Sequence, residues 1–277
     1  MAAIQALTVG HALDLESART GVVHSVFARA VNCEIGADLW TLLAADRADL
    51  PFGIRVAADD LGPLCLRRGE PVSVTSGFVG IGSGAGHLVV DARAAPRWIP
   101  TPHGPLAPGV AERLAAVAAV AAPRAWQGSA GLAHAVVSAL NDRDTLGRAL
   151  RGVVGCGPGA SPAGDDVLAG ILALLAAPHS GARGATAAHS LCRALLPLLP
   201  RTTDISGHLL RQAASGLFGR PVHELVCAVI ADQGSPRLKE SLRRVVETGA
   251  TSGADMCMGL LAAAPAFLPI HYERAEA

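Results

Sequence analysis

The chain has 277 residues, with 23 basic and 23 acidic side chains, and 51% of it is hydrophobic although only 3% is aromatic. This length allows one large domain or two ordinary ones with a core that needs no disulfides, and the neutral charge lacks the basic footprint of a nucleic-acid binder or an electrostatic membrane anchor. Alanine, leucine and valine supply the interior, which suits closely packed helices.

The N-terminus has no basic region ahead of an apolar segment, so no secretory signal is predicted. The longest charge-free apolar stretch, 256–270, is shorter than the ~20 residues of a membrane span and is interrupted by Pro265 and Pro269. No two cysteines form a C-x-x-C pair, which favours free thiols over a disulfide frame or a zinc site. We therefore expect a cytoplasmic protein. The six cysteines are Cys33, Cys65, Cys156, Cys192, Cys227 and Cys257.

Residues 1–100 contain short β-rich runs separated by turn residues, which predicts a small β-rich domain. The glycine-rich run 77–86 links two of these runs, and its Gly-x-Gly-x-Gly string at 82–86 predicts a hairpin turn because no helix follows it. The runs are 21–31, 38–44, 72–75 and 87–91.

Five prolines between residues 95 and 108 predict a linker, because proline lacks a backbone donor and disfavours helix for the residue before it. From residue 101 onward, apolar residues recur with helical spacing, notably in the runs 205–217, 221–230 and 238–246, and Gly249 is placed as a C-terminal stop. The fold class predicted is α+β: a β-rich domain over 1–100 and a domain of seven to nine helices over 101–277.

The most informative feature of the sequence is an internal echo between 164–173 and 253–262. Each copy follows a turn that carries a hydroxyl group, begins with a glycine, carries an aspartate in the first helical turn and has a second glycine one turn later. The second glycine, Gly170 or Gly259, costs about 1 kcal/mol relative to alanine in a helix, so we expect the two helices to cross closely at these positions.

Two adjacent helix N-termini would attract a small anion through their N–H groups and dipoles. The glycine-rich loop 155–161 could let such an anion approach the backbone. Asp165, Asp166 and Asp255 would repel one another, so the pattern requires a cation such as Mg²⁺, a neutralising arginine or a protonated carboxyl group. The arginines nearest in sequence are Arg151, Arg201 and Arg211.

Simpler interpretations stay open beside this one. An aspartate in a first helical turn can serve only as a cap. Cys156 has no histidine fixed beside it by sequence, which favours an unreactive thiol. The single histidines His24, His103, His208 and His223 show no metal-ligand spacing with one another.

Three ordered motifs and an N-terminal segment together resemble a known family. They are Gly155-x-Gly-x-Gly-x-Ser-Pro-x-Gly-Asp-Asp166, Thr202-Thr-Asp-Ile-Ser206 with Leu210, Ala213, Gly216 and Phe218, Gly249-x-Thr-Ser-Gly-x-Asp255 with Gly259, and Ser25-Val-Phe-Ala-Arg-Ala-Val-Asn32. In this combination the chain resembles the AllH-like (YlbF-like) family along nearly its whole length. Ala160, Ser161 and Ala163 depart from the leucine, threonine and serine of the family pattern, so a role for a hydroxyl group at position 163 does not carry over.

The resemblance implies a subunit of oxamate carbamoyltransferase, in bacterial allantoin (purine) degradation, which interconverts oxalurate plus phosphate and oxamate plus carbamoyl phosphate. It also implies other subunits, one of them similar to acyl-CoA synthetases. Two alternatives remain: a non-catalytic scaffold subunit, and a stand-alone Mg²⁺-dependent enzyme that transfers phosphoryl groups or cleaves amides.

The sequence identifies no general base and leaves the catalytic residues unknown. We expect the small anionic substrate to lie among the glycines, hydroxyl groups and acids of the motifs, and Mg²⁺, if it is used, among the three aspartates. The predicted anion-binding residues are Gly157, Gly159, Ser161, Gly164, Asp165, Asp166, Ser206, Arg211, Thr251, Ser252, Gly253 and Asp255.

Overall fold

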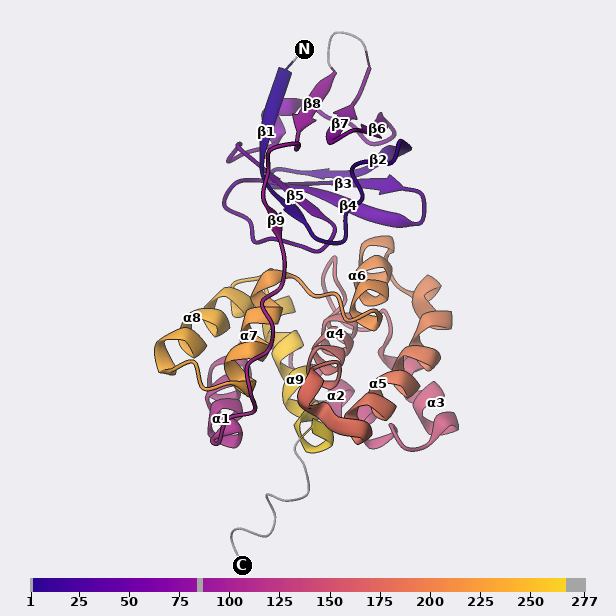
Figure 1. Cartoon of the computed structure of the whole chain (residues 1–277). Coiled ribbons are helices and arrows are strands. Elements are labelled where there is room, and N and C mark those ends of the chain that lie inside the picture. Colours follow the sequence, from indigo (N-terminus) through magenta and orange to yellow (C-terminus); the bar gives the residue numbers. More distant parts are fainter. Residues whose placement is uncertain (1, 84–86, 268–277) are drawn as a thin grey trace, which may run out of the picture. The chain divides into compact units, whose positions relative to one another are not determined.

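A computed structural model describes residues 2–83 and 87–267 of the chain (Figure 1). These residues form two compact units, one ending at Thr101 and the next beginning at Pro102. The first contains strands and the second contains helices, so the predicted α+β class is confirmed.

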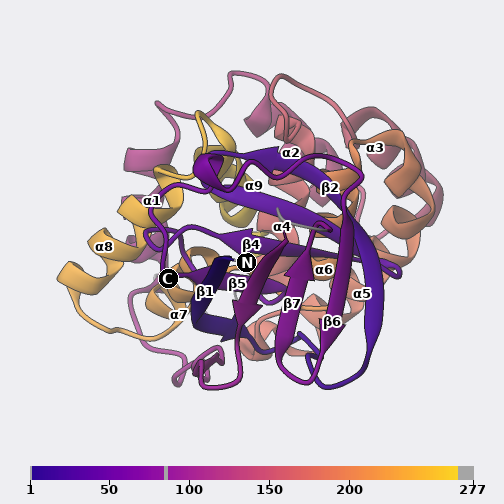
Figure 2. The same ribbon diagram turned by 90° about the horizontal axis from the view of Figure 1, so that it is seen from above.

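The first unit is a single sheet that closes into a barrel because β1 pairs on one side with β8 and on the other with β5. The order around the sheet is β5-β4-β3-β2-β6-β7-β8-β1, with β9 added beside the end of β1. Figure 2 shows β6 and β7 side by side in this sheet. The strands are β1 (Ala2–Gly10), β2 (Arg19–Phe27), β3 (Ala30–Ile35), β4 (Asp38–Leu43), β5 (Gly53–Val56), β6 (Pro71–Thr75), β7 (Phe78–Ile81), β8 (Leu88–Asp91) and β9 (Arg97–Trp98).

Alternation of side chains explains why these segments are strands. In β6 only Val72 and Val74 are buried, with exposed residues between them, which is the period of two expected for a sheet with one apolar face. Val79, Ile81 and Val90 on the neighbouring strands complete that face. The closed sheet therefore holds its own hydrophobic core, separate from that of the helices.

The structure corrects three sequence expectations in this unit. The run 21–31 is not one strand but two, β2 and β3, which pair antiparallel around a turn at 28–29. The run 77–86 is not only a link, because Phe78–Ile81 forms β7. Strands β1, β5 and β9 were not expected. The antiparallel pairing of β7 with β8 fits the expected hairpin, although Gly84–Gly86 lie outside the described residues.

In the described part of the second unit, nine α-helices follow a segment that has no regular structure between β9 and residue 109. They are joined by short turns and the 3₁₀ segments Pro178–Ser180 and Leu196–Arg201. The α-helices are α1 (Val110–Ala121), α2 (Ser129–Ser138), α3 (Arg143–Val153), α4 (Ala163–Leu175), α5 (Gly181–Leu195), α6 (Asp204–Ala214), α7 (Arg220–Ile230), α8 (Ser235–Val246) and α9 (Ser252–Phe267).

The helical spacing in the sequence predicted the positions of α7 and α8 well, but the predicted run 205–217 extends beyond the end of α6. Helix α6 ends at Ala214, and Gly216 follows with a φ of +76°. Leu217 therefore lies beyond the helix, and Leu209 is 40% exposed and does not belong to the buried face.

Helices α4 and α9 form the centre of the helical unit and lie side by side (Figure 1). All residues of α4 except Ala169 are buried, which explains its nearly continuous apolar sequence. No single helix in the described residues is both long and apolar enough to cross a membrane. One pair, α4 with residues 178–201, meets those limits only when taken together and is bent by 74°.

Candidate functional site

The two later glycines of the echo lie where α4 and α9 cross. A Cβ on Gly170 would come within 1.8 Å of the carbonyl oxygen of Met256, and a Cβ on Gly259 within 2.0 Å of that of Val167. Each glycine thus faces the carbonyl group three residues before its counterpart. The close crossing predicted from the sequence is confirmed, and its reciprocity is that of a local pseudo-twofold axis.

The first glycine of each copy packs against the helix before it. A Cβ on Gly164 would lie 2.1 Å from the carbonyl oxygen of Val153 at the end of α3, and one on Gly253 would lie 1.7 Å from that of Val245 near the end of α8. The repeated unit is therefore larger than the echoed sequence, because it comprises a helix, a connecting loop and a second helix.

Asp165 joins two of the motifs that are separate in sequence. Its carboxylate accepts hydrogen bonds from the backbone N–H of Gly155, at 2.9 Å, and from the Thr202 hydroxyl group. Burial raises the pKa of Asp165, while these donors and Ser206 act in the opposite direction. The residue thus anchors the glycine-rich loop to the segment that precedes α6.

Asp255 anchors a different segment to the start of α9. It is fully buried, and its Oδ1 accepts from the backbone N–H of Trp126 at 2.8 Å and from the Ser129 hydroxyl group at 2.6 Å. The carboxylate therefore links α9 to the N-terminus of α2. Its other oxygen, Oδ2, is buried and has no hydrogen-bond partner among the described residues.

Asp166, in the first turn of α4, is buried with only one of its two carboxylate oxygens hydrogen-bonded within the described residues. Its Oδ1 accepts from the Ser161 hydroxyl group at 2.7 Å, whereas its Oδ2 is buried and unpartnered within the described part of the chain. Burial, with smaller contributions from the charges of Asp255 and Asp165, raises the pKa of Asp166 to about 7 against the opposing effect of the Ser161 and Ser252 hydroxyl groups. A protonated carboxyl group is one of the three solutions that the sequence left open, and Asp166 has the surroundings to provide it near neutral pH.

These contacts bring the three sequence motifs to one place, which we call the α4–α9 cluster: Ser161, Asp166, Ser206, Ser252 and Asp255. The Ser206 hydroxyl group lies 3.5 Å from that of Ser161, and Thr203 caps α6 by accepting from the N–H of Ser206 at 3.2 Å. Thr251 and Ser252 are half-buried at the start of α9. Whether the cluster borders one cavity stays a prediction.

The helix N-termini are more occupied than the sequence suggested. The N–H of Gly164 donates to the carbonyl of Cys156 at 2.8 Å, and that of Gly253 to the carbonyl of Thr248 at 3.0 Å. Both glycines are buried. The exposed loop at Gly157 and Gly159 still offers backbone donors for an anion, because the N–H groups of these two glycines form no hydrogen bond within the described residues. Gly157 and Gly159 have positive φ values, 95° and 108°, that other residues rarely adopt.

No arginine neutralises the aspartates within the described residues. Arg211 is exposed on α6 and contacts His208 at 3.2 Å, while Arg201 reaches only the carbonyl of Arg151 at 3.4 Å. The three aspartates also do not form a group of ligand atoms within 4.8 Å of one another in the described chain. Mg²⁺ binding at these acids stays a prediction.

Two protein-family models match the chain, one in each of its two units. A model described as oxamate carbamoyltransferase subunit AllH matches residues 153–264, and a model of the AllH family N-terminal domain matches residues 4–97. The chain belongs to the AllH family. The suspected resemblance is thereby confirmed, and the family description makes the chain a subunit of a carbamoyltransferase complex that contains other protein subunits.

No solved structure matches this AllH-family chain. The matched range 153–264 contains the whole α4–α9 cluster, whereas the partners of Asp255 at Trp126 and Ser129 lie outside both matched ranges.

The sequence analysis missed a second group of side chains in this AllH-family chain, which could serve as metal ligands. His103, His223 and Cys227 place one ligand atom each within 4.8 Å of one another. Burial lowers the pKa of His103 to about 4, and the charges of His223 and His179 act in the same direction. The expectation of isolated histidines is therefore wrong for His103 and His223. Only the i, i+4 spacing of His223 and Cys227 could have signalled the group.

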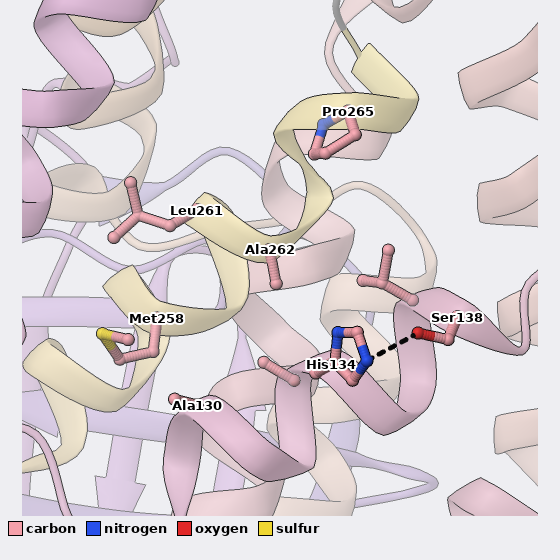
Figure 3. Close-up of a pocket in the computed structure, with 9 residues that line it drawn as sticks. Ala130, His134, Ser138, Met258, Leu261, Ala262 and Pro265 are labelled. Carbon is pink, nitrogen blue, oxygen red and sulfur yellow. Dashed lines mark hydrogen bonds between the residues drawn. The ribbon is translucent and has the colours of Figure 1, made fainter.

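A separate apolar groove of about 490 Å³ runs between α2 and α9 (Figure 3). His134 and Ser138 form its polar edge and are hydrogen-bonded at 3.3 Å. The other lining residues are Ala130, Ala133, Val137, Met258, Leu261, Ala262 and Pro265.

Proposed function

We propose that this chain is the subunit of an oxamate carbamoyltransferase that holds a small anionic substrate at the α4–α9 cluster. The reaction would be the one that the resemblance implies, with oxalurate and phosphate converted to oxamate and carbamoyl phosphate. The observation that carries the proposal is the convergence of the three motifs on Asp166, a carboxyl group with one buried, unpartnered oxygen.

A neutral Asp166 removes the conflict between an acidic cluster and an anionic substrate. An ionised carboxylate would repel phosphate or oxamate, whereas a protonated one donates a hydrogen bond. The elevated pKa of Asp166, about 7, makes the protonated form accessible at neutral pH. The Ser161 hydroxyl group and the N–H groups of Gly157 and Gly159 add further donors for an anion.

The same group suits the proton transfers of the reaction. A phosphate oxygen attacks the carbamoyl carbon of oxalurate, the bond from that carbon to the oxamate nitrogen breaks, and the nitrogen takes up a proton. In our proposal Asp166 supplies this proton and recovers one from the attacking hydrogen phosphate, so charge and protons balance. A general acid works best when its pKa lies near the working pH.

The scaffold alternative rests on Asp165 and Asp255. Both aspartates hold backbone segments in place through the hydrogen bonds described above, which is a purely architectural role. In a scaffold, the cluster would order the helices for contact with other subunits and would bind no substrate.

Binding and turnover separate these alternatives. We expect calorimetric affinity for phosphate, carbamoyl phosphate or oxamate to fall at least tenfold, or about 1.4 kcal/mol, in Ser161→Ala and Asp166→Asn. Ser138→Ala, which removes a hydroxyl group from α2, is the matched control and should bind normally. Carbamoyl phosphate formation should be measured with the same variants in the complex purified with its partner subunits.

Unchanged binding and turnover in both variants, with intact co-purification of partners, would refute the proposed site and favour the scaffold. Mg²⁺-dependent turnover by the isolated chain would instead favour the stand-alone enzyme.

A further inference from the structure

A group of metal-ligand side chains lies in the helical unit away from the aspartate motifs. His223 and Cys227 are four residues apart on α7, so both side chains emerge from the same face of the helix. The Cys227 sulfur lies 3.4 Å from Nε2 of His223. In a tetrahedral zinc site, bond lengths of about 2.0 Å to nitrogen and 2.3 Å to sulfur separate these two ligands by about 3.5 Å. The α7 pair already has nearly this separation.

The third side chain comes from the segment ahead of α1. The rings of His103 and His223 meet edge to face with their centroids 4.9 Å apart. His103, His223 and Cys227 each offer one ligand atom within 4.8 Å of the other two. Small side-chain rotations would bring all three onto one ion.

The segment that carries His103 is held in place by hydrogen bonds to the end of α7. The N–H of Ala107 donates to the carbonyl of Ile230 at 3.0 Å. The Arg113 guanidinium group, from α1, donates to the carbonyl groups of Val229 at 2.7 Å and Ala107 at 3.0 Å. The segment that carries His103 is therefore fixed against the end of α7 by hydrogen bonds within the helical unit.

A close backbone approach beside His103 supports the same conclusion. A Cβ on Gly104 would lie only 2.8 Å from the Cβ of Ala231, directly after α7. The segment thus runs tightly along this helix end, which limits how far the His103 ring can move from the α7 pair.

We propose that His103, His223 and Cys227 bind a zinc-type divalent metal ion, with a fourth coordination position open to water or a small ligand. Imidazole and thiolate ligands select zinc and related late transition metals over Mg²⁺, which prefers oxygen ligands. His103 and His223 are half-buried and Cys227 is buried, so an ion can enter from the histidine side. Three protein ligands with an open position are the arrangement of catalytic rather than structural zinc sites.

This site is independent of the proposed anion site. None of its ligands belongs to the α4–α9 cluster, and His103 lies outside both ranges matched by the family models. The failure of one proposal would therefore leave the other standing.

The test uses cobalt as a spectroscopic substitute for zinc in the full chain stripped with a chelator. We expect one equivalent of Co²⁺ to produce a thiolate-to-cobalt charge-transfer band and the visible bands of a four-coordinate ion, and Zn²⁺ to remove both. His103→Ala, His223→Ala and Cys227→Ser should each weaken binding at least tenfold, and Cys227→Ser should abolish the charge-transfer band.

Matched controls separate this site from unspecific binding. His134→Ala removes an exposed histidine on α2, and Cys192→Ser removes a half-buried thiol on α5. Both should keep the wild-type spectrum and affinity.

Absence of the charge-transfer band in the wild-type chain, or wild-type affinity in His103→Ala, would overturn the proposal. If Cys227→Ser does not fold, the two half-buried histidine positions decide the outcome, with circular dichroism of the metal-free variants as the check on folding.

Discussion

Replacing Asp166 with asparagine should change how the stability of the chain depends on pH. The folded state raises the pKa of this carboxyl group from 3.8 to about 7, chiefly because burial disfavours the charged form. Between these two values the folded chain holds a proton that the unfolded chain has released. The free energy of unfolding therefore falls as pH rises from about 4 to about 7. Above pH 7 the whole loss of stability from ionising the buried carboxyl group is present.

The size of the effect follows from the two pKa values. One pKa unit corresponds to about 1.4 kcal/mol, so the difference between 3.8 and about 7 amounts to on the order of 4 kcal/mol. Asp166 is only 4% exposed, so solvent does little to reduce the free-energy cost of its charge. Asparagine keeps the size and one acceptor oxygen but cannot ionise, so the variant escapes this pH-dependent loss.

Urea unfolding of the wild type and Asp166→Asn at several pH values between 4 and 8 measures the difference directly. We expect the stability of the variant relative to the wild type to increase by several kcal/mol across this range. Asp144→Asn, in the first turn of α3 and exposed, is the control and should give no such trend. Parallel pH profiles for the wild type and Asp166→Asn would show that Asp166 titrates normally and would refute the reasoning.

Two further predictions concern the helix crossing and the buried acid of α9. Gly170→Ala should lower stability by about 1–3 kcal/mol in thermal or urea unfolding, because its Cβ would meet the Met256 carbonyl oxygen at 1.8 Å, and wild-type melting would contradict the close crossing. Asp255→Ala should cost about 2–3 kcal/mol, because it leaves the buried Ser129 hydroxyl group and the half-buried backbone N–H of Trp126 without their acceptor. An Asp255→Ala variant as stable as the wild type would show that these bonds contribute little.

The sequence alone determined the fold class and the principal helix pair. The change from short alternating runs to helical periodicity located the strand and helix halves, because both patterns are local consequences of which side chains must be buried. The echo around Gly170 and Gly259 predicted the close crossing, because a glycine inside a helix carries a cost that close packing explains. The three ordered motifs likewise indicated the AllH family.

The sequence did not predict that the sheet closes into a barrel, which became visible only in the tertiary structure. Strand β1 joins β8 through Ala2–Gln5 and β5 through the residues that follow, with a register shift between Ala6 and Thr8. Such long-range pairing leaves little trace in a local pattern, since the partners, from Val9 and Ile54 to Ala2 and Leu88, are 45 to 86 residues apart.

The chemistry of the acids was also decided in three dimensions. From the sequence, Asp165, Asp166 and Asp255 look equivalent, yet Asp165 and Asp255 anchor backbone N–H groups, whereas burial at Asp166 raises the pKa of its carboxyl group to about 7. A pKa depends on burial and on donors within a few ångströms. Ser161 lies only five residues from Asp166 in the sequence, but Thr202 and Ser252 reach Asp165 and Asp166 only when three distant motifs fold together. For the same reason His103 is an isolated residue in the sequence and becomes a neighbour of His223 and Cys227 only when the segment before α1 packs along α7.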